Sequence, residues 1–572
     1  MSFWKQRGKV RAAIHGEENT QYFHAAASQR LRKNTITSLL LNGTEFHSHD
    51  QKATILRDHF TSILGSSAQR EHSLDLDGID PRHFDLLDLE KPFMEDEFWN
   101  AVKNLPTGKA PGPDGFTAEF LRACWTTIKS DLCEAFDKIY AMNGKGFQKL
   151  NEALLVLLPK KPDASALSDY RPISLIHIMA KLVAKVLSLR LAPGLNELVS
   201  SSQSAFISGR CFHDNFMLVQ QTVRHLHGSK ANRVLLKLDI ARTFDVVSWP
   251  FLLEVLRRFG FGEKWIAWIC GLLATSSTRI MINGEPGPPV WHRCGLRQGD
   301  PVSPQLFVLA VDILGRLIGR THDAGILQRL HPRRDIPAIS LYADDVMLFC
   351  HATQGDVEAV RAILALFSEA SGLRVNYAKS SATTLNGDPE ADATIDQVGC
   401  AKAGLPITYL GILLTLRRPS AAQLQPLVDS VAARLPAWKA WLMNKIGRLA
   451  LVKSVLAAIP IHQLLAFAPP KKTLRQLEKI QRGFLWAGRA AANGGHCHVN
   501  WRRVCRPLEY GGLGVQDLER AGLALRLRWM WFSHTDDDRA WRGLDLQFSR
   551  EEHALFFAST TMELGDGQTA LF

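Results

Sequence analysis

The sequence of 572 residues has few of the features that mark secreted or membrane proteins. It has nine cysteines and no CxxC pair, which argues against a disulfide framework and for a reducing compartment. Its first residues, Met1-Ser-Phe-Trp-Lys-Gln-Arg7, lack the apolar core of a signal peptide. No stretch of about 18 uncharged apolar residues occurs, so no membrane span is expected. We therefore expect an intracellular protein of the nucleus or cytoplasm, not a secreted one.

The sequence also lacks the standard patterns of two common sites. The turn-rich segment Lys109-Ala-Pro-Gly-Pro-Asp-Gly115 does not have the GxxxxGK[ST] order, which argues against a phosphate-binding P-loop. Near the C-terminus, the spacing of four candidate metal ligands fits no standard zinc pattern; these are His496, Cys497, His498 and Cys505. We expect no zinc site there.

Acidic residues are outnumbered, with 56 Asp and Glu against 68 Lys and Arg, for a net charge of +12. The excess is unevenly placed. Residues 416–490 carry thirteen basic and two acidic residues (net +11), and residues 1–40 carry seven and two (net +5). Residues 491–572 carry nine and eleven (net −2). Two positive segments suit a polyanionic partner such as a nucleic acid.

The pattern of apolar residues predicts an α+β protein of three or four domains or subdomains. Apolar residues make up 46% of the chain, enough for a large core. We predict strands at 154–158 and 234–240, and a hairpin of two strands over 339–349. The polar, acidic stretch 66–95 reads as a loop or linker. Predicted helices cover 117–140, 175–200, 212–228, 250–273 and 302–319, and the chain after 416 is also predicted to be helical.

Three aspartates stand where apolar strand sequence ends. Asp344 and Asp345 lie at the bend of the predicted hairpin, and Asp239 ends an apolar strand 105 residues earlier. Clustered carboxylates on rigid strands are the hard oxygen ligands that a pair of divalent cations needs for nucleotide addition. Each element alone is better explained as a turn or a strand-end cap. The combination favours a metal site.

Seven segments, in this order, resemble the motifs of reverse transcriptases from non-LTR, LINE-type retrotransposons, most closely those of plants. The resemblance is densest between about 100 and 415. The segments are Asp169-Tyr-Arg-Pro-Ile-Ser-Leu175, Gln203-Ser-Ala-Phe206, Leu238-Asp-Ile-Ala-Arg-Thr-Phe-Asp245, Leu296-Arg-Gln-Gly-Asp-Pro-Val-Ser-Pro304, Tyr342-Ala-Asp-Asp345, Ser371-Gly-Leu-Arg-Val-Asn-Tyr-Ala-Lys-Ser380 and Tyr409-Leu-Gly-Ile412.

The resemblance implies an RNA-directed DNA polymerase that extends a DNA primer on an RNA template with deoxynucleoside triphosphates. Asp239, Asp344 and Asp345 would bind two Mg²⁺ ions, with Mn²⁺ as an alternative, and Ile240 would lend its backbone carbonyl. Phe244 would lie beneath the sugar and exclude a 2′-hydroxyl; the alternative is an ordinary core phenylalanine.

The resemblance also assigns residues to the incoming nucleotide. Lys160 and Arg171 would contact the triphosphate, Gln298 and Gly299 would shape the nucleotide pocket, and Lys379 would protonate the departing pyrophosphate. For the three cations the alternative is an ordinary solvated surface residue. One departure is visible: Arg242-Thr243 stands where the family usually has Lys-Ala.

By the same resemblance the fold is a right-hand polymerase. Residues 1–90 would form a basic N-terminal extension and linker, 91–233 the fingers, 234–415 the palm, 416–490 a helical thumb, and 491–572 the truncated start of the post-thumb region. The reverse transcriptase domain would span about 140–415. An endonuclease would precede residue 1.

Two other kinds of protein stay open. One is a non-catalytic nucleic-acid-binding remnant of a truncated element. The other is an RNA-templated RNA polymerase or an intron-encoded maturase; Phe244 argues against the RNA polymerase.

Overall fold

The computed structural model describes residues 28, 34–66, 70, 72–142, 147–161, 163–386, 389–435, 443–489, 497 and 499–561. These residues divide into two compact units. The larger unit holds the described residues from His15 to Cys211 and from Asn232 to Lys402; the smaller holds Phe212–Ala231 and those from Ala403 onward. None of the described helices is both long and apolar enough to cross a membrane.

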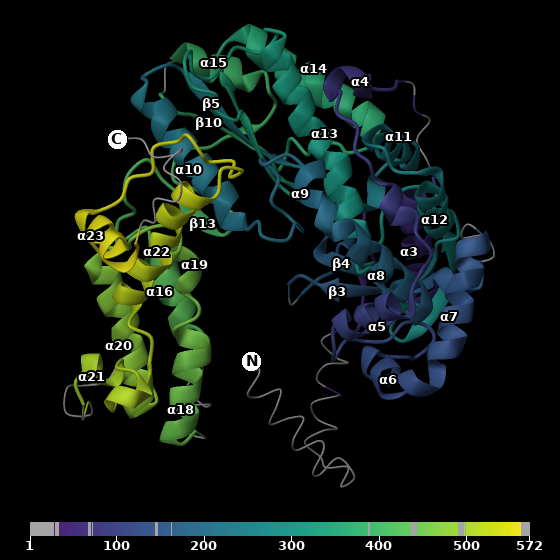
Figure 1. Ribbon diagram of the computed structural model, residues 1–572, viewed down its shortest axis with the longest axis horizontal. Coiled ribbons are helices and arrows are strands. Elements are labelled where there is room, and N and C mark those ends of the chain that lie inside the picture. Colours follow the sequence, from purple (N-terminus) through teal and green to yellow (C-terminus); the bar gives the residue numbers. More distant parts are fainter. Residues whose placement is uncertain are drawn as a thin grey trace. The chain divides into compact units, whose positions relative to one another are not determined.

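A five-stranded sheet in the larger unit carries the candidate site. Its order is β11-β10-β5-β9-β8, and all pairs are antiparallel except β10 with β11. Because β5 lies in the middle of the sheet, five of its seven residues are buried, and four of the seven are apolar. Helix α13 packs against β8 and helix α14 against β9. Figure 1 labels two strands of this sheet, β5 and β10, and the helices α13 and α14. The strands are β5 (Arg233–Asp239), β8 (Ile339–Tyr342), β9 (Asp345–His351), β10 (Ser381–Thr384) and β11 (Ala401–Lys402).

A second, four-stranded sheet of order β4-β3-β6-β7 belongs to the same unit. Strand β3 pairs antiparallel with β4 and parallel with β6. Its core includes residues far apart in the chain, among them Leu56, Leu157 and Ile280. The strands are β3 (Glu152–Pro159), β4 (Tyr170–Ile176), β6 (Ser277–Ile282) and β7 (Glu285–Trp291), and a separate hairpin consists of β1 (Leu39–Leu41) and β2 (Thr44–Phe46).

Helices surround these sheets. The longer ones are α3 (His49–Leu64), α5 (Glu95–Asn104), α7 (Trp125–Met142), α8 (Ile178–Leu191), α11 (Trp249–Phe259), α12 (Glu263–Ala274), α13 (Ser303–Asp323) and α14 (Gln354–Ser371). The shorter helical segments are α4 (Leu76–Ile79), η2 (Leu87–Glu90), α6 (Ala118–Ala123), η3 (Gln148–Asn151), η4 (Leu167–Asp169), η5 (Ala192–Gly194), α9 (Leu195–Leu198), η6 (Thr243–Val246) and α15 (Pro389–Asp396).

The smaller unit is mainly helical and joins one early helix to the end of the chain. Helix α10 (Phe212–Gly228) buries Asp214, which forms an ion pair with Arg539 (2.7 Å) and accepts a hydrogen bond from the Trp541 indole (3.0 Å). The other elements are β12 (Ile407–Tyr409), β13 (Ile412–Leu414), α16 (Gln425–Ala432), α18 (Lys445–Leu451), η7 (Val452–Leu456), α19 (Ile461–Leu464), α20 (Lys471–Ala487), α21 (Trp501–Val504), η9 (Leu508–Tyr510), α22 (Leu518–Thr535) and α23 (Arg550–Ser559).

These elements confirm the α+β class, the strands at 154–158 and 234–240, the hairpin at 339–349, and the helices at 212–228 and 302–319. The helical character after 416 is also confirmed. Trp486 packs against the core of the smaller unit.

Three predicted helices were wrong in extent. The segment 175–200 begins within strand β4, and its helix is interrupted at Pro193, which has no N–H for an α-helical hydrogen bond. The segment 250–273 is two helices, because α11 ends at Gly260 with φ +92°. A Cβ there would lie 2.2 Å from the Phe84 carbonyl oxygen. The segment 117–140 is interrupted at Cys124 between α6 and α7.

The prediction of a loop or linker over 66–95 was wrong in part. This segment contains α4 and η2, and it buries Phe93. Asp80 is also buried and pairs with Arg316 of α13. The local composition of residues 66–95 does not indicate such long-range contacts, and a polar segment can therefore pack against the core without looking apolar.

Candidate active site

The candidate site forms where β5 ends beside the β8–β9 hairpin. Asp239, the last residue of β5, is the direct cross-strand partner of Asp345, the first residue of β9. Directly opposed residues point to the same face of a sheet, with Cβ atoms about 4.5–5.5 Å apart. Asp344 lies in the two-residue turn between Tyr342 and Asp345. The three aspartates that the sequence singled out are therefore neighbours at one end of the sheet.

The end of β5 is fixed by the segment 371–380. The Asn376 N–H donates to the Asp239 carbonyl (2.7 Å), and the Ser380 hydroxyl accepts from the Asp239 N–H (3.1 Å). The buried Ile240 forms an antiparallel bridge with Val375. This segment, a candidate motif in the sequence, therefore holds the backbone that presents the first aspartate.

The charges of Asp344 and Asp239 act on the Asp345 carboxylate. Asp345 lies at the surface, yet desolvation by the surrounding chain raises its pKa, and the charges of Asp344 and Asp239 raise it further; Lys237 acts in the opposite direction. The Thr243 hydroxyl donates to the Asp344 carboxylate (3.4 Å).

Carboxylates are the hard oxygen ligands that Mg²⁺ prefers, so the chemistry of these three side chains fits that ion. However, no group of three or more His, Cys, Asp or Glu side chains is already arranged to hold a metal in the described part of the chain. Of the four C-terminal residues considered for zinc, His496 and His498 lie outside the described residues.

Phe244 lies in the turn that follows β5. Its ring is half-buried and stacks on Phe307 of α13, with centroids 4.6 Å apart. Its carbonyl accepts from the Leu296 N–H (2.6 Å), which ties this turn to the segment 296–304. Gly295 permits the close approach: its φ is +79°, and a Cβ there would lie 2.4 Å from the Asp245 carbonyl oxygen.

The segment 296–304 also meets strand β4. The Ser174 N–H donates to the Gln298 carbonyl (3.1 Å). Gly299 has a φ of +112°, and a Cβ there would lie 2.8 Å from the Ser174 carbonyl oxygen. Arg171 is exposed on the same strand, three residues before Ser174. The backbone of Gln298 and Gly299 therefore contacts strand β4, the strand that also carries Arg171.

Two predicted lysines are exposed. Lys160 follows β3; its amine donates to the Ser168 carbonyl (2.8 Å), and its N–H donates to the Asp169 carbonyl (2.8 Å), which puts it beside the start of β4. Lys379 lies immediately before Ser380, the residue that bonds to Asp239. Lys379 is thus next to the residue that fixes the end of β5, whereas Lys160 lies beside β3 and β4 of the four-stranded sheet.

Sequence reasoning missed two buried residues of the same region. The Arg297 guanidinium donates to the Asn151 carbonyl (2.9 Å) and side chain (2.5 Å) and pairs with Asp300 (3.4 Å). Asp300 in turn accepts from the Val302 N–H (3.0 Å) at the start of α13. Burial lowers the pKa of Arg297 and raises that of Asp300. Both lie inside the segment 296–304, but nothing in the neighbouring sequence indicates that they are buried and that Gln298 is not.

Comparison with known proteins finds one family that matches part of the chain. Residues 158–414 match the family described as "Reverse transcriptase (RNA-dependent DNA polymerase)". This matched part of the chain, just under half of the 572 residues, is similar to reverse transcriptases. The matched range contains Asp239, Asp344 and Asp345 and the strands β5, β8 and β9 of the candidate site.

Individual relatives come from transposable elements. The chain is 29% identical over 476 residues to "Transposon TX1 uncharacterized 149 kDa protein" of Xenopus laevis, covering 81% of this chain and 35% of the relative. It is 23% identical to "Retrovirus-related Pol polyprotein from type-2 retrotransposable element R2DM" of Drosophila melanogaster, covering 75% and 40%. It is 24% identical to "Retrovirus-related Pol polyprotein from type-1 retrotransposable element R2" of Popillia japonica, covering 75% and 59%.

These matches confirm the resemblance to retrotransposon reverse transcriptases; the plant-like character stays a prediction. The chain spans 35% to 59% of the length of these three relatives.

Proposed function

We propose that this protein is an RNA-directed DNA polymerase of a LINE-type retrotransposon, which adds deoxynucleotides to the 3′-hydroxyl of a DNA primer on an RNA template. One observation carries the proposal: the antiparallel register that opposes Asp239 and Asp345, with Asp344 in the adjoining turn. Neither β5 nor the hairpin brings three carboxylates together by itself.

Asp239, Asp344, Asp345 and the Ile240 carbonyl would hold two Mg²⁺ or Mn²⁺ ions. Such ions, when bound, lower the pKa of the primer hydroxyl and stabilise the charge on the triphosphate and pyrophosphate. The chain itself supplies rigidity. Pairing of β5 with β9 and the hydrogen bonds from 371–380 fix the backbone beneath these ligands, as precise positioning of reactants requires.

The incoming nucleotide would lie between residues near the end of the five-stranded sheet and residues of the four-stranded sheet. The Phe244 ring is supported by its stacking on Phe307 and would exclude a 2′-hydroxyl. Arg171 and Lys160 would contact the triphosphate from β4 and the end of β3. Gln298 and Gly299 would border the base, and Lys379 would protonate the departing pyrophosphate.

In this proposal the fingers span 91–233, the palm 234–415 and the thumb 416–490. Helix α20 carries five basic residues, Lys471, Lys472, Arg475, Lys479 and Arg482, against one acidic residue, Glu478. A basic helix of this kind would track the phosphate backbone, and binding would weaken as salt rises.

A primer-extension assay tests the proposal. The wild-type protein, with Mg²⁺, deoxynucleotides and a DNA-primed RNA template, should extend the primer, and Asp344→Asn should abolish extension. Asp335→Asn, which changes an exposed acid outside the site, should extend normally. Extension that survives Asp344→Asn in a clean preparation would contradict the catalytic assignment. Salt-sensitive binding without any extension by the wild type would favour the non-catalytic remnant.

A further inference from the structure

The turn that carries Asp344 has a strained backbone. Ala343 has a φ of +52°, in the left-handed region that costs an L-residue about 1–2 kcal/mol. Its N–H donates to the side-chain oxygen of Gln203 (3.2 Å). Gln203 is completely buried, and the same oxygen accepts from the Ala205 N–H (2.9 Å). One buried side-chain atom therefore binds the turn from outside the hairpin.

The backbone around Gln203 also pairs with strand β8. The Leu341 N–H donates to the Ser202 carbonyl (2.9 Å), and the Ser204 N–H donates to the Leu341 carbonyl (3.3 Å). These bonds form a short parallel bridge between Gln203 and Leu341. Because β8 is the last strand of the sheet, the segment 199–205 covers an edge that would otherwise be open.

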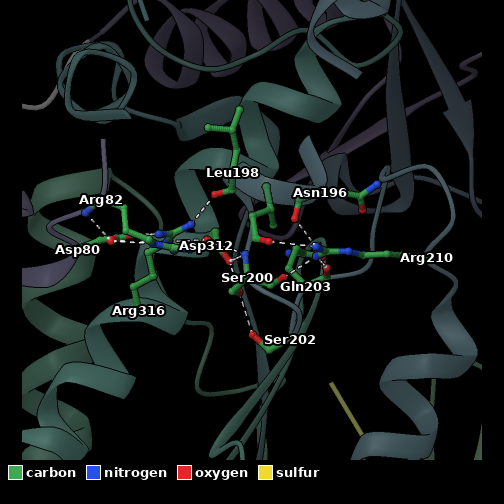
Figure 2. Close-up of polar contacts among 11 residues, drawn as sticks. Asp80, Arg82, Asn196, Leu198, Ser200, Ser202, Gln203, Arg210, Asp312 and Arg316 are labelled. Atoms are coloured by element: carbon green, nitrogen blue, oxygen red, sulfur yellow. Dashed lines mark hydrogen bonds and ion pairs between the residues drawn. The ribbon is translucent and has the colours of Figure 1, made fainter. Parts of the chain in front are cut away.

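Arg210 holds this segment in shape. Its guanidinium donates to four backbone carbonyls, those of Asn196 (2.9 Å), Val199 (3.1 Å), Ser200 (2.5 Å) and Gln203 (2.7 Å). The planar fork of arginine can reach several acceptors at once, which a lysine ammonium cannot do in the same geometry. Figure 2 shows the Arg210 side chain aimed at this group of carbonyls.

A buried ion-pair cluster anchors the other side of the segment (Figure 2). Asp312, completely buried on α13, accepts from both the N–H (3.2 Å) and the hydroxyl of Ser200. Arg316, one turn later, donates to Asp312 (2.7 Å), pairs with Asp80 and donates to the Leu198 carbonyl. The segment is thus fixed between α13 on one side and the hairpin on the other.

We propose that Gln203 is a positioning residue for the candidate catalytic hairpin: its side-chain oxygen holds the left-handed Ala343, and so fixes where Asp344 and Asp345 present their carboxylates. Arg210 and the Asp312–Arg316 pair keep Gln203 in place. The inference rests on the proposed polymerase function for its catalytic meaning, but the bracing of the turn can be measured without any reaction.

Two isosteric variants separate the oxygen from the bulk of the side chain. Gln203→Met keeps the volume and removes the acceptor, whereas Gln203→Glu keeps an oxygen acceptor. Gln305→Met is the matched control, because Gln305 is also buried in the larger unit but donates to Ser188 (3.0 Å), away from the hairpin. Arg210→Lys provides a second approach, since it keeps the charge and loses the fork.

The first readout is hydrogen exchange of peptides covering 339–349, followed by mass spectrometry. In Gln203→Met, exchange there should accelerate about tenfold; in Gln203→Glu and Gln305→Met it should stay within about threefold of wild type. Arg210→Lys should accelerate exchange in both 196–203 and 339–349. Unchanged exchange at 339–349 in Gln203→Met and Arg210→Lys would overturn the proposal.

The second readout is single-nucleotide incorporation. Gln203→Met should lower the maximal rate about tenfold or more, with the KM for the nucleotide within about threefold, because the carboxylates and not the nucleotide contacts are displaced. Gln203→Glu should restore most of the rate. A wild-type protein that incorporates nothing while the exchange pattern follows the prediction would contradict the polymerase function and still support the brace.

Discussion

Asp245 offers a sharp test of how the site region is packed. It lies one residue after Phe244, partly buried, and its backbone oxygen faces Gly295. Burial raises the pKa of its carboxyl from 3.8 to about 6, and the nearby charge of Arg242 only partly opposes this. At neutral pH the folded protein therefore carries a carboxylate where a neutral group would be more stable. Asp245→Asn should remove that cost.

The magnitude follows from the shift in pKa. Below pH 3.8 the carboxyl is protonated in both the folded and the unfolded chain, so it costs nothing. As pH rises, the unfolded chain releases its proton first, and the free energy of unfolding falls until the folded carboxyl ionises near pH 6. A shift of about two pKa units corresponds to about 3 kcal/mol, of which about 1 kcal/mol is already lost at pH 4.5.

The assay is urea-dependent hydrogen exchange of peptides from β5, which reports on the larger unit separately from the smaller one. Relative to wild type, Asp245→Asn should gain about 2 kcal/mol more at pH 8 than at pH 4.5. Asp335→Asn, an exposed acid, should show no such difference. A gain that is independent of pH, or an Asp245→Asn protein less stable than wild type at pH 8, would refute the argument from burial.

Two further predictions concern the other parts of the chain. Arg539→Met should lower the free energy of unfolding of the smaller unit by about 3 kcal/mol, because it deprives the buried Asp214 of its ion-pair partner. Arg542→Met, at a half-exposed arginine, should lower it by about 1 kcal/mol or less. Both values are measured by urea-dependent hydrogen exchange of peptides from the smaller unit. Equal losses would contradict the importance of that pair. Phe244→Ala should raise ribonucleotide use relative to deoxynucleotide use about tenfold or more in primer extension, and an unchanged ratio would show that Phe244 serves only as a core residue against Phe307.

The sequence predicted the strands of the candidate site well because their signal is local. The strand 234–240 and the hairpin 339–349 are short apolar runs that end in acids, and antiparallel pairing then opposes Asp239 and Asp345. Helix 212–228 was predicted with its observed limits. The prediction of helix limits failed where a single residue breaks an otherwise helical pattern. Pro193 and Gly260 each interrupt such a run.

Long-range contacts could not be predicted from one sequence. Nothing near Gln203 indicates that its side chain reaches Ala343, 140 residues later. Likewise, Asp214 and Arg539 are 325 residues apart, yet their pair joins α10 to the C-terminal helices in one unit. Such residues become recognisable only once burial and partners are known.

The most direct test of the central claim is Mn²⁺ binding, measured by electron paramagnetic resonance, to the protein with a primer–template and a chain-terminating nucleotide. A metal site shared by both strands predicts that Asp239→Asn and Asp345→Asn each weaken Mn²⁺ binding strongly, whereas Asp335→Asn leaves it unchanged. Wild-type Mn²⁺ affinity in either site variant would contradict the claim that these aspartates hold the same ions.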